Sequence, residues 1–159
     1  MREIKHHMKA LRLLLNTDNT LSTALLRIAL GAVFFPHGAQ KVLGWFGGYG
    51  FSGTMGFMTG TLHIPAVFAF LAIAAEFAGA LGLIVGLGTR IAALGIASVM
   101  AVAITMHAQY GFFMNWTGAQ KGEGIEYHVL ALAVAIALIL RGGGKLSADS
   151  AIAKTLPTA

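Results

Sequence analysis

Four long apolar runs separated by polar connections constrain this chain more than any other feature. They are Leu21–Gly38, Pro65–Leu87, Arg90–Tyr110 and Ile125–Leu140. A helix needs about 20 mostly apolar residues to cross a bilayer, and about 17 is the lower limit, so the flanks of the shorter runs must contribute. Because 57% of the residues are hydrophobic, the sequence predicts an all-α membrane protein, a four-transmembrane-helix bundle.

The basic residues gather on one side of these predicted spans. Lys41 and Lys121 lie in the connections on one side, and the other side carries Arg2, Lys5, Lys9, Arg12, Arg90, Arg141, Lys145 and Lys154. Cytoplasmic connections are enriched in Lys and Arg, so we expect a multi-pass protein of a bacterial-type inner (plasma) membrane with both termini cytoplasmic. This distribution also argues against a nucleic-acid partner, despite the formal net charge of +5.

The chain divides into three predicted parts. Residues 1–20 form a basic amphipathic cytoplasmic arm, whose helically spaced apolar residues favour contact with membrane lipid. Residues 21–141 form the four-helix transmembrane domain, with a Gly-rich and aromatic extracytoplasmic loop, Gln40–His63, between the first two spans. Residues 142–159 form a cytoplasmic tail. The chain has no cysteine, which excludes disulfides, Cys-bound iron–sulfur clusters and thiol relays.

Two charged residues interrupt the apolar runs at similar predicted depths. Arg27 and Glu76 both lie roughly 15 Å below the outer ends of their spans, at a rise of about 1.5 Å per residue. A charge near the bilayer centre costs about 2.5–3.5 kcal/mol on insertion scales, and such residues usually pair inside the protein. We therefore predict an Arg27–Glu76 ion pair, which either only locks the helices together or also borders a ligand or proton site.

A second polar group lies near the outer boundary: His37, His107, Glu126 and His128. Gln40 and Lys41 share a helical face with His37 if the helix continues past Pro36, and Trp45 follows them. Histidines can hydrogen-bond a quinone and transfer protons near neutral pH. A transition metal, haem, or simple hydration at the water boundary would also account for such a group. Because no short metal-ligand spacing is present, we assign no metal ligand.

Several segments resemble the DoxX family over roughly Leu21 to Leu146. They are Leu26–Gly31, His37-Gly38-Ala39-Gln40-Lys41, Gly44–Gly50, Gly53-Thr54, Glu76 and Gly122–His128. The resemblance implies a four-helix inner-membrane protein. The family is named for its relation to a subunit of a thiosulfate:quinone oxidoreductase, its members are often labelled oxidoreductases, and some are linked to oxidative stress or quinone detoxification.

The first hypothesis is therefore a quinone-linked oxidoreductase component that takes electrons from a soluble redox partner. His37, His107 and His128 would contact the quinone, and Glu76 and Glu126 would carry protons. The predicted binding residues are Arg27, Gln40, Lys41 and Trp45. The alternative is a non-catalytic membrane scaffold or a subunit that binds lipid or another small hydrophobic ligand, and whether the chain is an enzyme stays open. A transporter would require a homo-oligomer.

Overall fold

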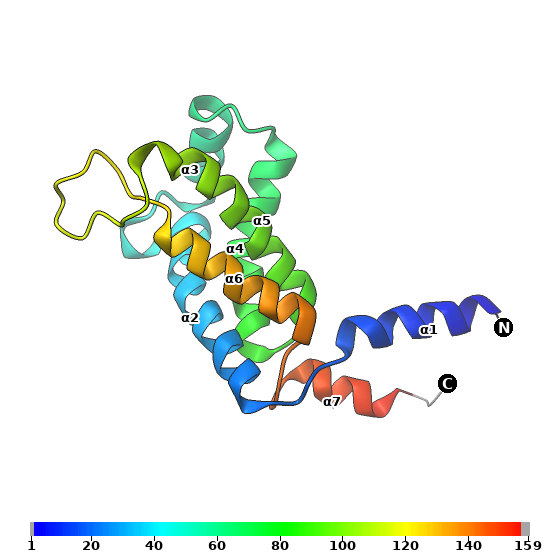
Figure 1. The fold of residues 1–159 in the computed structure, drawn as a ribbon. Coiled ribbons are helices and arrows are strands. Elements are labelled where there is room, and N and C mark those ends of the chain that lie inside the picture. The colour runs from blue at the N-terminus through cyan, green and yellow to red at the C-terminus, as the bar shows by residue number, and fades with distance from the viewer. Residues whose placement is uncertain (1, 157–159) are drawn as a thin grey trace.

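The computed structural model describes residues 2–156, and this part of the chain contains helices and no strand (Figure 1). The elements in chain order are α1 (Arg2–Leu15), α2 (Leu21–Leu43), η1 (Trp45–Gly47), α3 (Gly50–Gly56), η2 (Phe57–Thr61), α4 (Ala66–Val85), α5 (Thr89–His107), η3 (Ala108–Tyr110), α6 (Glu126–Arg141) and α7 (Ala148–Thr155).

Within the described part of the chain, three helices are long and apolar enough to cross a membrane, judged by length and composition. They cover Leu21–Leu43, Ala66–Val85 and Thr89–Tyr110. Helix α6 has 16 residues, which span about 24 Å at 1.5 Å per residue, less than the roughly 30 Å of a typical hydrocarbon core. The all-helical prediction is confirmed, whereas the count of four spans stays a prediction.

Helix α2 is longer than the sequence predicted. We expected its span to end at Gly38, but the helix continues through Pro36 to Leu43 and ends at Gly44, whose φ of 71° is left-handed. A proline removes one backbone donor from a helix, and here that loss does not stop the helix. The condition for placing His37, Gln40 and Lys41 on one continuous helix is therefore met.

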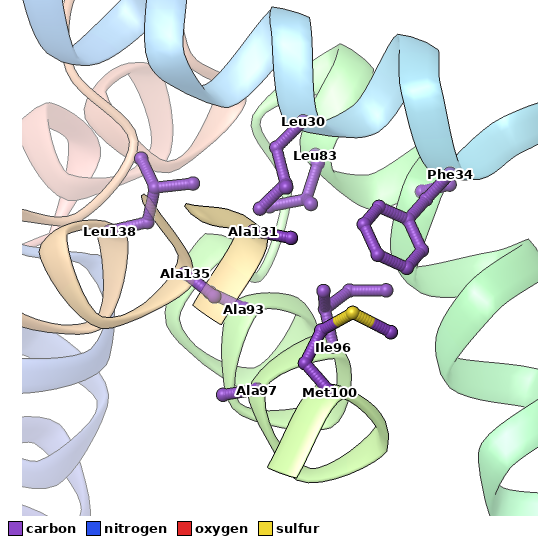
Figure 2. Close-up of a cluster of buried hydrophobic side chains, with 11 residues drawn as sticks. Leu30, Phe34, Leu83, Ala93, Ile96, Ala97, Met100, Ala131, Ala135 and Leu138 are labelled. Carbon is purple, nitrogen blue, oxygen red and sulfur yellow. The ribbon is translucent and has the colours of Figure 1, made fainter. Parts of the chain in front are cut away.

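A single apolar core is shared by α2, α4, α5 and α6, as Figure 2 shows. Its members are Leu30, Phe34, Ala80, Leu83, Ala93, Ile96, Ala97, Met100, Ala131, Ala135 and Leu138. Lipid tails are as apolar as these side chains, so association of the helices in a bilayer depends on close packing more than on removal of water.

Glycines bring α2 and α4 into backbone contact. A Cβ atom on Gly38 would lie 2.5 Å from both the carbonyl oxygen of Glu76 and the Cα of Phe77, and one on Gly31 would lie 2.9 Å from the carbonyl oxygen of Ala80. These distances are too short for any side chain. The two glycines therefore set the register of the two antiparallel helices, with Gly38 opposite Glu76.

The segment predicted as a cytoplasmic tail packs against the helices. Figure 1 shows α1 and α7 at the same end of the packed helices, which we call the terminal end; the opposite end, with α3 and residues 111–125, is the loop end. The carboxylate of Asp149 accepts hydrogen bonds from the backbone N–H groups of Gly88 (2.7 Å) and Thr89 (2.9 Å) and so caps the start of α5. The N–H of Lys145 donates to the carbonyl of Thr20 at 2.9 Å.

Replacing Gly38 with alanine should lower stability by about 1–3 kcal/mol, the usual cost of overpacking a tight contact. Alanine is a better helix former than glycine by up to about 1 kcal/mol. A net loss of stability in the variant would therefore come from the clash of the added Cβ with Glu76. Gly60→Ala is the matched control, because a Cβ there meets nothing within 4 Å. Thermal midpoints of purified protein check the prediction, and equal midpoints for the two variants would contradict it.

Asp18, in the connection between α1 and α2, should make stability depend on acid pH. Partial burial raises its pKa, but hydrogen bonds from Thr23, Thr20 and Arg141 outweigh that effect and hold the pKa below its usual range. A carboxyl group with a lowered folded pKa stabilises the protein above its unfolded pKa of about 3.9, and the benefit disappears as the pH falls through the folded value.

We therefore expect the thermal midpoint to decrease once the pH is below about 4. Asp18→Asn should be less stable than the wild type at pH 7 and should show a smaller fall in acid. An identical pH profile for the two proteins would show that Asp18 contributes nothing.

Candidate functional site

Arg27 is a fully buried cation, 1% exposed, on the second turn of α2. Its guanidinium donates only to backbone carbonyls. The acceptors are Gly143 from Nε (2.8 Å), Ile84 (2.7 Å) and Leu83 from one terminal nitrogen, and Leu146 (3.4 Å) from the other. These carbonyls belong to the last turns of α4 and to the segment before α7. Arg27 thus links three parts of the terminal end.

The predicted Arg27–Glu76 ion pair is wrong. Arg27 lies opposite Leu83 and Ile84, about two turns or roughly 10 Å along α4 from Glu76. The depth estimate failed because it was counted from Gly38, whereas α2 continues to Leu43 and Gly38 itself lies against Glu76. The carboxylate whose charge acts on Arg27 is that of Asp149.

Glu76 pairs instead with Lys41. The ammonium group of Lys41 donates to Oε2 of Glu76 in a close ion pair, in which the side chain of Glu76 is 8% exposed and that of Lys41 is 30% exposed. Both residues were predicted site residues, but on separate grounds. Since a charge among apolar helices is stable only with a partner, Lys41 supplies the counter-charge that the carboxyl group of Glu76 needs on α4.

His37 and Tyr127 border this ion pair. His37 lies one helical turn before Lys41, and the charges of Lys41 and Glu76 both act on its ring. The charge of Glu76 also acts on Tyr127 of α6, whose buried hydroxyl makes no hydrogen bond within residues 2–156. The ring of Phe34 lies near both, with its centre 6.2 Å from that of His37 and 6.3 Å from that of Tyr127.

Tyr127 was missed by the sequence analysis, although a signal existed. It precedes the buried residues Ala131, Ala135 and Leu138 of α6 at helical spacing, and this periodicity places position 127 on the inward side of the helix. A tyrosine at the start of that side can bring a hydroxyl to the boundary between core and water.

His107 and His128 come together, as their shared predicted depth suggested. Their rings stack with centres 4.8 Å apart at an interplanar angle of 26°. The ring of Tyr127 lies 5.6 Å from that of His128, so the stacked pair adjoins the group around Glu76. The ring contact of His37 is with Phe34, and no ring contact joins it to His107 or His128 among the described residues.

Three predicted site residues hold the loops instead of joining the group. Glu126 accepts a hydrogen bond from the indole N–H of Trp116 at 3.1 Å. The side chain of Gln40 donates to the carbonyl of Phe46 at 3.2 Å. Trp45 is 53% exposed and its ring packs against that of Phe46. Among the described side chains, those of residues 8 and 10–156, no group of three or more His, Cys, Asp or Glu could hold a metal ion.

The Lys41–Glu76 pair should show strong coupling in a double-mutant cycle. Lys41→Met leaves the buried carboxylate of Glu76 without its counter-charge, and Glu76→Gln does the same to the half-buried ammonium group of Lys41. Each change should therefore be destabilising, and the double variant should recover about 0.5–3 kcal/mol of the summed loss. Thermal unfolding in detergent gives the four stabilities. The control cycle pairs Arg27→Gln with Glu76→Gln, and coupling there but not with Lys41 would contradict the assignment.

Comparison with known proteins identifies the family of this chain. The chain is 29% identical over 141 residues to "Putative oxidoreductase CatD" of Bacillus subtilis (strain 168), an alignment that covers 88% of this chain and 93% of the relative. No solved structure matches the chain. The family model described as DoxX matches residues 22–109, more than half of the sequence. Together with the three apolar helices, this match identifies a membrane protein, and the chain belongs to the DoxX family.

Proposed function

We propose that this protein is a quinone-linked oxidoreductase component of a bacterial inner membrane, with its site at the loop end. The observation that carries the proposal is the unpartnered, buried hydroxyl of Tyr127 beside the Lys41–Glu76 ion pair. The name of the Bacillus subtilis relative, an oxidoreductase, supports the reaction class.

The proposal includes four membrane crossings, by α2, α4, α5 and α6. Because α1 and α7 lie at the same end of these helices (Figure 1), an even number of crossings fits the chain path. The short α6 would reach across with the help of its flanks. Arg90 and Arg141 lie at the terminal end, and an excess of basic residues is typical of the cytoplasmic side, so both termini would be cytoplasmic.

The residues around Glu76 suit a quinone. A quinone head group is a flat ring with two carbonyl acceptors, and it binds where a few hydrogen-bond donors meet apolar and aromatic side chains. Tyr127 offers a buried donor with no partner in the described chain, His37 makes no hydrogen bond there either, and Phe34 offers a ring face near both. A bound quinone would supply two-electron, two-proton redox chemistry.

Each side chain then has a role that follows from its chemistry. Tyr127 would donate a hydrogen bond to one carbonyl oxygen of the ligand and orient its ring. His37 can accept or release a proton near neutral pH, and Lys41 keeps the carboxylate of Glu76 ionised and ready to accept one. We propose that a soluble partner supplies the electrons, because the chain has no cysteine to carry them.

A non-catalytic scaffold or lipid-binding subunit is the second candidate. It is favoured by the way the charges satisfy one another internally: Arg27 has four carbonyl acceptors and Glu76 has Lys41. In this case the polar residues serve assembly, and no ligand needs the hydroxyl of Tyr127.

Quinone that stays bound during gentle purification tests the proposal. We expect mass spectrometry to find quinone in wild-type protein extracted in mild detergent, and Tyr127→Phe to retain about 2–10-fold less, since a hydrogen bond contributes about 0.5–1.5 kcal/mol. Tyr49→Phe is the matched control, because Tyr49 is 84% exposed. Absence of quinone from every preparation, with no thermal shift on adding quinone, would favour the scaffold.

A further inference from the structure

The stacked imidazoles of His107 and His128 have no role in the function proposed above. They come from the last residue of α5 and the first turn of α6, two helices that pack side by side (Figure 1). Stacked imidazoles repel one another when both are protonated, so one neutral ring or a shared ligand must stabilise the contact. The surroundings of each ring show which ligand is suitable.

The first ring already has the arrangement of a metal ligand. Nδ1 of His107 lies 3.1 Å from the carbonyl oxygen of Glu123. A carbonyl only accepts, so Nδ1 carries the proton, and Nε2 of the neutral ring keeps its lone pair. Histidines that bind metal ions nearly always donate their other ring N–H to a carbonyl or carboxylate in this way. Nε2 of His107 makes no hydrogen bond with the described residues.

The second ring is more deeply buried and less well satisfied. His128 is 8% exposed, and its Nδ1 makes no hydrogen bond of normal geometry within residues 2–156, although the backbone of Gly124 lies near the ring. Buried polar atoms nearly always have a partner. A buried ring nitrogen that has no partner of good geometry, beside a second imidazole, leaves a place that a water molecule or an ion can complete.

One carboxylate lies near the two rings. The carboxylate of Glu123 acts on His128, and one of its oxygens is held by the backbone N–H of Asn115 at 2.8 Å. Two imidazoles beside a carboxylate suit borderline ions such as Zn²⁺ or Cu²⁺, which prefer nitrogen ligands, more than Mg²⁺ or Ca²⁺, which prefer oxygen.

We propose that His107 and His128 form a two-imidazole site for a divalent transition-metal ion, with water in the remaining positions. A zinc–nitrogen bond is about 2.0–2.1 Å long, so one ion can join two nitrogens up to about 4 Å apart. Rings whose centres lie 4.8 Å apart can turn about their side-chain bonds and bring one nitrogen of each to a shared ion. With only two protein ligands, the other coordination positions are open to water and the ion exchanges with the solution. A bound ion would link α5 to α6 at the loop end.

Metal titration of the full chain tests the site directly, and it is independent of quinone. The protein would carry an affinity tag without histidine and the substitutions His6→Ala and His7→Ala, which remove a second pair of adjacent histidines. After treatment with a chelator, calorimetry with Zn²⁺ should show one site per chain. Electron paramagnetic resonance with Cu²⁺ should show coupling to two imidazole nitrogens.

Asparagine substitutions identify the ligands. His107→Asn and His128→Asn should each weaken Zn²⁺ binding at least tenfold, whereas His63→Asn should bind normally, since His63 is exposed and its φ of 54° is one that asparagine tolerates. Metal-free thermal midpoints show that each variant folds; His107 is only half-buried, so its variant remains informative if His128→Asn unfolds. No binding by the parent protein, or unchanged binding in the His107→Asn variant, would overturn the proposal.

Discussion

A charge among apolar helices must find a partner, and this requirement shapes both ends of the α2–α4 pair. At the terminal end the partners of Arg27 are backbone carbonyls, which a helix leaves free at its C-terminus. Nearer the loop end, the partner of Glu76 is another side chain, Lys41. The close contact at Gly38 sets the register of α2 against α4. In this register Arg27 and Glu76 lie too far apart to pair with each other, so each has its own partner.

The two solutions have different consequences for the chain. Arg27 gathers the end of α4 and the segment before α7 around itself, and Asp149 caps α5 nearby, so the terminal end is self-contained. The ion pair near the loop end instead adjoins groups that still have unused hydrogen-bonding capacity, His37 and Tyr127. We therefore place ligand chemistry at the loop end and regard Arg27 as structural.

The sequence predicted the helices well because hydrophobic periodicity and length determine them locally. It placed His107 and His128 near the same outer boundary of adjacent helices, and the structure stacks their rings there. It failed for Arg27 because the partners are backbone carbonyls, at the end of α4 and in the irregular segment around Gly143, which no side-chain pattern reveals. Counting depth from helix ends was a second source of error: the end of α2 was placed at Gly38, five residues before Leu43, and five residues are more than one helical turn.

The charge state of Glu76 in a lipid bilayer tests the central claim most directly. Infrared spectra of protein in nanodiscs, with Glu76→Gln used to assign the band, would show whether this carboxyl group is ionised at neutral pH. We predict an ionised carboxylate in the wild type and in Arg27→Lys, and a protonated carboxyl group in Lys41→Met. A carboxylate that stays ionised without Lys41, or that loses its charge only when Arg27 is changed, would contradict the account.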